Sequence, residues 1–371
     1  MVPGKDARLS SDREAERLEF LKAAGLADAE RHPLPGDAST RRYERLMTPG
    51  GVSLMLMDQA PAAESVICRP GMTPEQRLAA GWNATARLSA GRIEAFAGVA
   101  AYLRSLGLSA PDILALDAPR GLAVLEDFGD GLFARVIGAG QDETPLYLGA
   151  IEALARLHEE TPPASLDGHG LSWPLLDYDA TALQGGADLF VDWMPKLVPS
   201  LNFDEAARAE WAAVWAPHVA RGAAGASVLA HRDYHAENLI WLPGRTGAAR
   251  VGMIDFQDAV LAHPSWDLHS LLQDARRDVP AEIEAQALNR YFELRPDINR
   301  EAFMVDYAAL AALNEARILG IFARLVARDG KPRYRAFMPR MWRHLEQNLK
   351  RPELAQVAAW LDRHVPQETR T

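Results

Sequence analysis

The sequence predicts an α+β protein of two lobes, a small β-rich N-terminal lobe and a larger, mostly helical C-terminal lobe. The chain has 371 residues, which is more than one average domain. Strand-forming runs lie mostly in the first third of the chain, whereas helical periodicity dominates the rest. The segment Phe128-Gly129-Asp130-Gly131 interrupts the pattern between these two parts. We therefore expect lobes at residues 1–128 and 129–371.

The N-terminal lobe is expected to contain two helices and two β-hairpins. Capping residues and apolar spacing predict one helix within residues 10–26, and residues 92–106 read as another. Two runs rich in strand formers flank Thr48-Pro49-Gly50-Gly51, which is a hairpin signature, and residues 112–127 read as a further hairpin. Residues 59–91 show weak periodicity with several Pro and Gly, so we expect an irregular or mobile insertion there.

The C-terminal lobe is expected to be helical, with two short strands near residues 238–242 and 250–254. Helices are predicted at 132–138, 144–160, 204–221, 265–277, 280–294, 300–328 and 334–349. Internal repeats and low-complexity tracts are absent from the sequence.

Composition limits the classes of function. Apolar residues make up 48% of the sequence and charged residues 24%, as in ordinary soluble proteins. The formal net charge of -10 argues against nucleic acid or an anionic membrane as a partner. Cys68 is the only cysteine, which suits a reducing compartment. Because the sequence has neither a secretory apolar segment near its start nor a membrane-length apolar run, we expect a soluble monomer in the cytoplasm.

One polar stretch, HRDYHAENL at residues 231–239, has the spacing of a site. Asp233 and Asn238 lie in a loop that leads into a predicted strand, and the next strand ends at Asp255. If the two strands pair, all three side chains lie at one end of a small hairpin. Phosphoryl transfer needs a carboxylate to accept the acceptor's proton and hard oxygen ligands for Mg²⁺. The alternative is a plain polar loop followed by an unrelated acid.

HRDYHAENLI together with MIDFQDA resembles the catalytic and metal-binding segments of the aminoglycoside phosphotransferase branch of the protein-kinase-like fold. The resemblance implies ATP as donor, Asp233 as catalytic base, and Asn238 and Asp255 as Mg²⁺ ligands. It also implies that His231 and Asp267 support the catalytic loop, although Asp267 fits equally well as a helix N-cap. Only 11 residues separate Asp255 from Asp267, too few for the peptide-docking segment of a protein kinase. We therefore expect a small-molecule acceptor.

The sequence departs from the kinase pattern at the lysine that pairs with the phosphates. Met57, followed by Asp58, occupies that place, and Phe96 or Ala97 lies near the position of the partner glutamate, with Glu94 close by. Loss of both partners together is physically coherent, because a buried glutamate left alone would be costly.

The loop GDASTRRY is expected to approach the phosphates through its small residues, and one of its two arginines could supply the missing charge. Strand alternation sends these arginines to opposite faces, so only one should contact phosphate; alternatively, both lie on the surface. The residues predicted to bind the nucleotide are Gly36, Ser39, Arg41, Arg42, Glu126 and Phe128.

Five motifs in order narrow the resemblance to the bacterial cell-wall amino-sugar kinases: GDASTRRYERL, LMDQAP, HRDYHAENL, DFQDA and LGIFARLVARDGKPRY. That family phosphorylates the anomeric hydroxyl of N-acetylmuramate and N-acetylglucosamine during peptidoglycan recycling, which implies a sugar substrate here. Two alternatives stay open. One is a kinase of an aminoglycoside, choline or homoserine; the other is a nucleotide-binding pseudokinase.

The acceptor is expected beside the helix at 300–328. Asn314 and Arg317 share one face of it and could bind sugar hydroxyls or a carboxylate, unless that edge pairs with Glu315 and solvent. Asp188 and Trp193 are further candidates, because tryptophan suits the apolar face of a sugar, although most tryptophans lie in cores.

Overall fold

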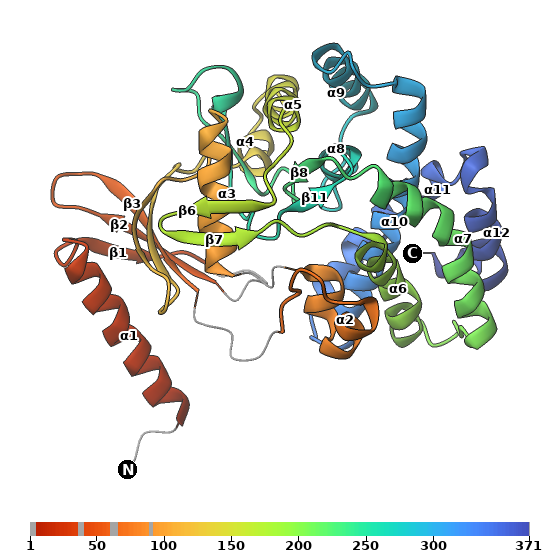
Figure 1. The fold of residues 1–371 in the computed structure, drawn as a ribbon, viewed down its shortest axis with the longest axis horizontal. Helices are drawn as coiled ribbons and strands as arrows, with labels where there is room; N and C mark the ends of the chain where they lie inside the picture. Colours follow the sequence, from red (N-terminus) through yellow and green to blue (C-terminus); the bar gives the residue numbers. More distant parts are fainter. Residues whose placement is uncertain (1–4, 36–40, 60–65, 89–91, 371) are drawn as a thin grey trace.

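The computed structural model describes residues 5–35, 41–59, 66–88 and 92–370, with side chains from residue 12 onward. It has the two-lobed α+β architecture that the sequence predicts: a sheet with two helices at one end, and a helical lobe at the other (Figure 1). The sheet ends at Glu126 and the first helix of the second lobe begins at Phe133, so we keep residue 128 as the proposed division.

The N-terminal lobe is built on a five-stranded antiparallel sheet in the order β1-β2-β3-β5-β4. Its strands are β1 (Glu30–Pro33), β2 (Arg42–Met47), β3 (Ser53–Asp58), β4 (Ile113–Asp117) and β5 (Leu122–Glu126). Both predicted hairpins, β2–β3 and β4–β5, are present. β1 was not predicted from the sequence, because its four residues, Glu-Arg-His-Pro, include no strand-forming residue.

One helix covers each face of this sheet. α1 (Lys5–Ala23) packs on one face and α3 (Ile93–Ser105) on the other (Figure 1). Because side chains alternate along a strand, each strand contributes to both faces. The α1 face holds Phe20, Leu21, Leu46, Leu56, Leu122 and Val124. The α3 face holds Met57, Phe96, Ala123 and Leu125 and continues into the core of the second lobe.

Charged residues reinforce the contact between α1 and the sheet. Glu44 and Asp58 are buried on the α1 face, where Arg17 lies 3.0 Å from Glu44 and Arg31 lies 2.7 Å from it. Arg13 bonds Asp58 through two of its nitrogens. Asp58 therefore bonds to α1 and lies on the opposite face of the sheet from Met57.

The expectation of an irregular insertion at residues 59–91 is wrong where the structure describes it. This segment contains α2 (Pro74–Ala80) and a π-helix, η1 (Asn83–Arg87). Thr73 and Gln76 form a capping box that begins α2, a signal readable in the sequence but missed. Buried Arg77 then donates to two carbonyls of η1 at 3.1 and 2.8 Å, which fixes the two pieces to each other.

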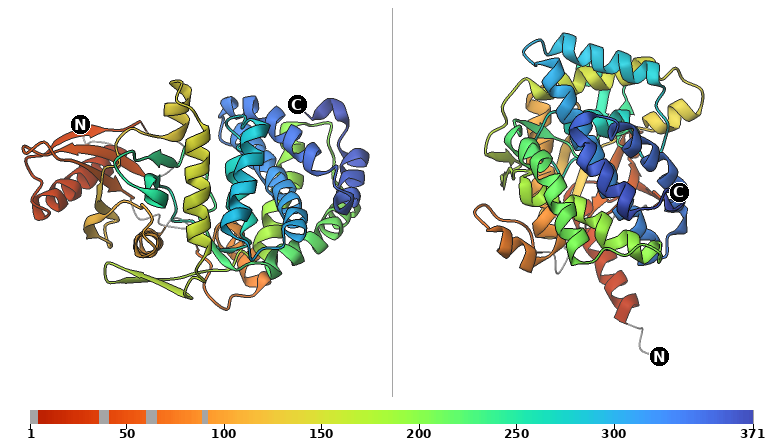
Figure 2. Two further views of the ribbon diagram at one scale, coloured as in Figure 1. Left: turned by 90° about the horizontal axis from the view of Figure 1, so that it is seen from above. Right: turned by 90° about the vertical axis from the view of Figure 1, so that its right-hand side faces the viewer.

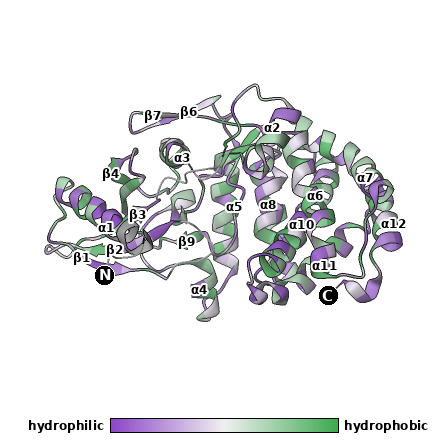
Figure 3. Cartoon of the chain, turned by 90° about the horizontal axis from the view of Figure 1, so that it is seen from below, coloured by the Kyte–Doolittle hydropathy of each residue, from purple (hydrophilic) through white to green (hydrophobic). Residues whose placement is uncertain are grey.

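The C-terminal lobe contains a helix in each of the seven predicted segments, of which α7 runs three residues beyond its predicted end, and two α-helices that were not predicted, α6 and α12. The helices are α4 (Phe133–Gly138), α5 (Thr144–His158), α6 (Ala180–Leu197), α7 (Glu205–Ala224), α8 (Ser265–Leu272), α9 (Ala281–Leu294), α10 (Arg300–Ala327), α11 (Met338–Asn348) and α12 (Ala355–His364). α5 stands between the sheet and the remaining helices (Figure 2). Its residues are mostly hydrophobic, whereas α1 and α12 at the two ends of the molecule contain many hydrophilic residues (Figure 3).

The central contact of this lobe is between α6 and α10. A Cβ added at Gly320 of α10 would lie 2.4 Å from the backbone of Leu189 in α6, so only glycine permits this approach. Interior glycines lower the intrinsic helix propensity of α6, which explains why this helix was not predicted. Burial against α10 stabilises it instead.

Three two-stranded ribbons complete the lobe: β6–β7 (Ser165–Gly168 and Leu171–Pro174), β8–β11 (Val228–Ala230 and Val260–Ala262) and β9–β10 (Leu239–Trp241 and Val251–Met253). Only β9–β10 was predicted. β6–β7 lies against α3 of the other lobe (Figure 1), where a Cβ on Gly98 would lie 2.5 Å from the Leu166 carbonyl oxygen. None of the helices in the described ranges combines the length and apolar composition that a membrane crossing needs.

Candidate active site

The polar stretch at residues 231–238 is a loop between β8 and β9, and the β9–β10 pairing determines what lies beside it. Leu239 pairs with Met253, and the Ile254 amide donates to the Asn238 carbonyl at 3.1 Å. The antiparallel register therefore brings the start of β9 and the end of β10 together. Asp233, Asn238 and Asp255 lie at this one end of the hairpin, as strand pairing predicted.

A buried carboxylate holds the loop. Asp267, fully buried in the first turn of α8, accepts hydrogen bonds from the amides of His231 at 2.6 Å and Arg232 at 2.9 Å. Burial raises the pKa of Asp267 to about 7, against the lowering effect of these two amides. Pro264 occupies the N-cap of α8, so the N-cap interpretation of Asp267 is wrong. Arg232 has φ +73°, a conformation that L-residues rarely adopt.

The side chains of His231 and Arg232 also serve the architecture of the loop. The buried His231 ring packs edge-on against Tyr234 and Phe256. The Arg232 guanidinium donates to the Ala86 and Arg87 carbonyls of η1 at 3.1 and 2.8 Å. The loop at residues 231–238 is thereby tied to the segment that was expected to be irregular.

Asn238 is oriented by the loop itself. Its Nδ2 donates to the main-chain carbonyl of Asp233 at 2.9 Å, which fixes the plane of the amide. Asp255, at the far strand end, has φ +62° and a side chain that is 41% exposed. Within the described ranges no hydrogen bond reaches Asn238 Oδ1 or Asp255 Oδ2, so both oxygens are free to bind a cation. An amide and a carboxylate oxygen are a donor set that fits Mg²⁺.

Strand alternation separates the two arginines of the loop GDASTRRY as expected. Arg41 is two residues from Tyr43, which pairs with Met57, so Arg41 points to the same face of the sheet as Met57. Its side chain is 4% exposed and its Nη1 lies 2.8 Å from Asp255 Oδ1, while Arg42 is exposed on the other face. Burial works against the Arg41 charge, but Tyr43 and Asp255 stabilise it, and the net effect raises the pKa of Arg41.

The place of the expected lysine–glutamate pair is apolar. Met57 is fully buried, and Phe96 stacks on Phe256 with ring centroids 5.0 Å apart. Glu94, the nearest acid in α3, pairs with Arg92 at 2.6 Å instead of facing the sheet. Among the residues with described side chains, Arg41 is the cation that pairs with Asp255.

The other predicted nucleotide residues fall into two groups. Gly36 and Ser39 lie outside the described residues. Glu126 and Phe128 lie where the sheet meets the second lobe, and both contact Arg245: Glu126 by an ion pair and Phe128 by a ring face 5.0 Å from the guanidinium. Their side chains thus connect the two lobes, while their main chain runs along the junction.

A cavity of about 400 Å³ opens beside Asp233. The loop at residues 231–238, α10 and the α2–η1 segment line it, the last through Trp82, Asn83 and Arg87. Asp233 and Asp258 are its acids. Five arginines line it as well: Arg87, Arg232, Arg317, Arg324 and Arg328. A molecule bound here would therefore meet a strongly basic wall together with one carboxylate of the catalytic loop.

The predicted acceptor residues are distributed in and around this cavity. Arg317 lines it, and Arg317 Nη1 donates to buried Asn314 at 2.9 Å. Trp193 and Asp188 are not lining residues: Trp193 lies 5.7 Å from Arg328, and Asp188 accepts from Gln184 on its own helix.

Two further findings concern α10. Glu315, expected as a solvent-facing partner of the Asn314–Arg317 edge, is buried and bonded to Asn348, so that alternative is wrong. Sequence reasoning missed Trp82, Arg87 and Arg324 as lining residues. Only Arg324 left a signal in the sequence, because it lies two helical turns beyond Arg317 on the same face.

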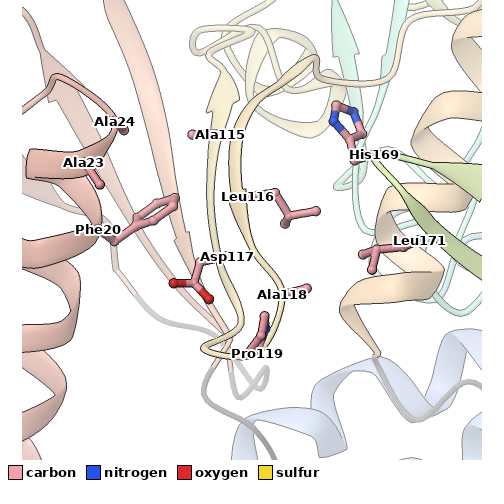
Figure 4. Close-up of a pocket in the computed structure, with 10 residues that line it drawn as sticks. All are labelled: Phe20, Ala23, Ala24, Ala115, Leu116, Asp117, Ala118, Pro119, His169 and Leu171. Atoms are coloured by element: carbon pink, nitrogen blue, oxygen red, sulfur yellow. The ribbon is translucent and has the colours of Figure 1, made fainter.

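A second cavity, of about 520 Å³, lies between α1, β4 and the turn of β6–β7 (Figure 4). Phe20, Leu116 and Leu171 give it a largely apolar wall, and Asp117 and His169 are its charged or polar side chains. It contains no residue of the catalytic loop.

The fold and this site together define a phosphotransferase of the protein-kinase-like class. Residues 30–313 match the phosphotransferase enzyme family, and the chain belongs to that family. Over 362 residues, 98% of this chain and 99% of the relative, it is 56% identical to the N-acetylmuramate/N-acetylglucosamine kinase of Caulobacter vibrioides. A protein of the same name from Pseudomonas aeruginosa is 30% identical over 342 residues, 90% of this chain and 88% of that one. A choline/ethanolamine kinase family protein from Mesorhizobium loti has a TM-score of 0.56 at 15% identity, covering 95% of this chain and 98% of that one, a likeness of fold alone.

Proposed function

We propose that this chain is an ATP-dependent kinase that phosphorylates the anomeric hydroxyl of an amino sugar, N-acetylmuramate, N-acetylglucosamine or both, in cell-wall recycling. The observation that carries the proposal is the position of Asp233, which is held in a braced loop and faces the arginine-lined cavity. The 56% identity to a kinase of that name over nearly the whole chain supports the choice of sugar.

In this reaction Asp233 accepts the proton of the anomeric hydroxyl while the hydroxyl oxygen forms a bond to the γ-phosphorus of ATP. The bond from that phosphorus to the β,γ-bridging oxygen breaks, and ADP leaves. Because Asp267 and Asn238 fix the main chain on either side of Asp233, its carboxylate is positioned before the acceptor arrives.

Asp255 and Asn238 would hold Mg²⁺, which would offset the negative charge of the transferred phosphates. Arg41 takes the role of the missing lysine, since its guanidinium lies on the Met57 face of the sheet beside Asp255. The main chain at Glu126–Phe128 completes the described part of the nucleotide site.

The charge of the cavity favours this acceptor over the alternatives. A cationic choline or aminoglycoside would meet five arginine side chains and two carboxylates, an unfavourable balance. A pseudokinase would have no use for a braced carboxylate facing a cavity. The single free cysteine, Cys68, is buried and suits a cytoplasmic enzyme, which we take to be a monomer.

The test is release of ADP from Mg-ATP in the presence of a panel of acceptors: both amino sugars, choline, homoserine and an aminoglycoside. We expect turnover with one or both sugars and none with the amines. Turnover with an amine alone, or with no acceptor, would refute the proposal. Omitting Mg²⁺, with and without added chelator, tests the metal requirement in the same assay.

A further inference from the structure

The five arginines of the acceptor cavity differ in how their charge is balanced. Arg87 pairs with Asp258 at 2.9 Å and Arg328 pairs with Asp329 at 2.6 Å. Arg232 donates to main-chain carbonyls. These three guanidinium groups therefore already have partners.

The remaining two, Arg317 and Arg324, have no carboxylate partner in the described part of the chain. Arg317 donates only to the Asn314 amide oxygen, at 2.9 Å, and its Nε is buried without a hydrogen bond. Arg324 forms no hydrogen bond or ion pair with any described residue; its Nε is buried, and its guanidinium lies 5.6 Å from the Trp82 ring. Buried guanidinium nitrogens without acceptors are costly, so a bound anion would stabilise both.

The electrostatics of Arg324 agree with this geometry. Burial lowers the pKa of Arg324, and the neighbouring Arg328, Arg317 and Arg87 lower it further, against the raising effect of Asp329. Positive charge thus crowds at one part of the cavity wall, where Arg317 and Arg324 share a face of α10 and Arg328 is the C-cap of that helix. An anion bound there would relieve the repulsion among these cations.

We infer that Arg317 and Arg324 bind a carboxylate carried by the acceptor sugar and so select an acidic amino sugar over a neutral one. The inference rests on the proposed function. In the proposed function the reacting hydroxyl lies at Asp233, which lines the cavity, and the phosphates would lie beside the Arg41–Asp255 pair. Neither group would then supply the anion for these arginines. An acid group on the sugar, held apart from the reacting hydroxyl, is the ligand whose chemistry fits. Trp82 beside Arg324 gives the sugar ring an aromatic face.

The experiment compares N-acetylmuramate with its neutral carboxamide, a ligand of nearly the same shape, in the wild type and in Arg324→Gln and Arg317→Gln. We expect the wild type to prefer the acid, and each substitution to reduce that preference in kcat/KM by about 10- to 100-fold, mainly through KM, the effect of losing a charge-assisted hydrogen bond. Activity on the carboxamide should change little. Arg324→Lys, which keeps the charge, should retain part of the preference.

Arg300→Gln is the matched control, because Arg300 is an exposed arginine near the start of the same helix and contacts Asn289 rather than the cavity. It should leave the preference for the acid unchanged. A second arm measures product inhibition by N-acetylglucosamine 1-phosphate, which should be equal in the wild type and Arg324→Gln.

Three results would overturn the inference. One is an unaltered acid preference in both glutamine variants, and another is an equal loss on acid and carboxamide. The third is weaker inhibition by the sugar phosphate in Arg324→Gln with the acid preference intact, which would mean that these arginines bind phosphate. Failure of the proposed function looks different, because the wild type would then phosphorylate neither compound.

Discussion

Arg41→Ala is the substitution that tests how this protein replaces the missing lysine. Arg41 is 4% exposed, and its Nη1 lies 2.8 Å from Asp255 Oδ1, while Nε donates to Gln59 at 3.0 Å. If the guanidinium neutralises the transferred phosphates, its removal costs about 1.5–3 kcal/mol of transition-state stabilisation, as for other hydrogen bonds to charged groups. That corresponds to a fall of about 10- to 150-fold in kcat/KM for ATP.

The structure supplies a matched control in the neighbouring residue. Arg42 is exposed on the opposite face, so Arg42→Ala should leave the kinetics nearly unchanged. Arg41→Met keeps most of the buried stem and removes only the charge, so it separates lost packing from lost electrostatics. It should lose activity like Arg41→Ala while unfolding at a temperature closer to that of the wild type. Adding Met57→Lys to Arg41→Ala should restore only part of the activity, because a lysine ammonium cannot reproduce the contact of two guanidinium nitrogens with a phosphate.

The assay is steady-state kinetics with varied ATP at saturating sugar, with thermal unfolding of each variant beside it. A role of Arg41 in neutralising the phosphates is refuted if both alanine variants keep wild-type kcat/KM. Main-chain amides and Mg²⁺ would then be enough to offset the phosphate charge. This role is equally refuted if Arg42→Ala is the variant that loses activity, since Arg42 and not Arg41 would then face the phosphates.

The remaining predictions concern single acids. Asp233→Asn should keep nucleotide binding but lower kcat by about 10²- to 10⁴-fold, and a change within a few-fold would remove it as the base. Asp255→Ala should abolish Mg-dependent ATP binding measured by calorimetry, whereas wild-type affinity would put the metal elsewhere. Asp188→Asn should leave turnover intact, because Asp188 does not line the cavity, and should change how stability depends on pH. Burial raises the pKa of Asp188 to about 6, so its contribution is full below about pH 4 and is lost as the pH rises through 6. The free energy of unfolding of the wild type relative to Asp188→Asn should thus fall by up to about 3 kcal/mol from pH 4 to 7 in urea titrations; a flat difference would contradict this.

The parts of the site that were predictable are those that depend on local sequence. Asp233, Asn238 and Asp255 follow from one loop and two adjacent strands, and antiparallel pairing alone brings them together. The opposite orientation of Arg41 and Arg42 follows in the same way from the alternation of side chains along a strand. Which of the two lies on the Met57 face could be decided only from the register between β2 and β3.

The acceptor cavity could not be predicted from the sequence, because it joins segments that are far apart in the chain. Trp82, Asp233 and Arg324 come from three such segments, and no periodicity relates them. α6 was missed for a related reason, since its glycines lower helix propensity locally but permit close packing on α10. Thr73 and Gln76 differ from these cases: their capping box was readable in the sequence.

The most direct test of the proposed anomeric phosphorylation is the position of the transferred phosphate. After incubation with Mg-ATP and N-acetylmuramate or N-acetylglucosamine, ³¹P NMR with proton coupling shows which sugar carbon bears the new phosphate. We expect a phosphorus coupled to the anomeric proton, and a signal that Asp233→Asn forms about 10²- to 10⁴-fold more slowly. Coupling to the protons of another carbon, or release of inorganic phosphate with no sugar phosphate, would contradict it.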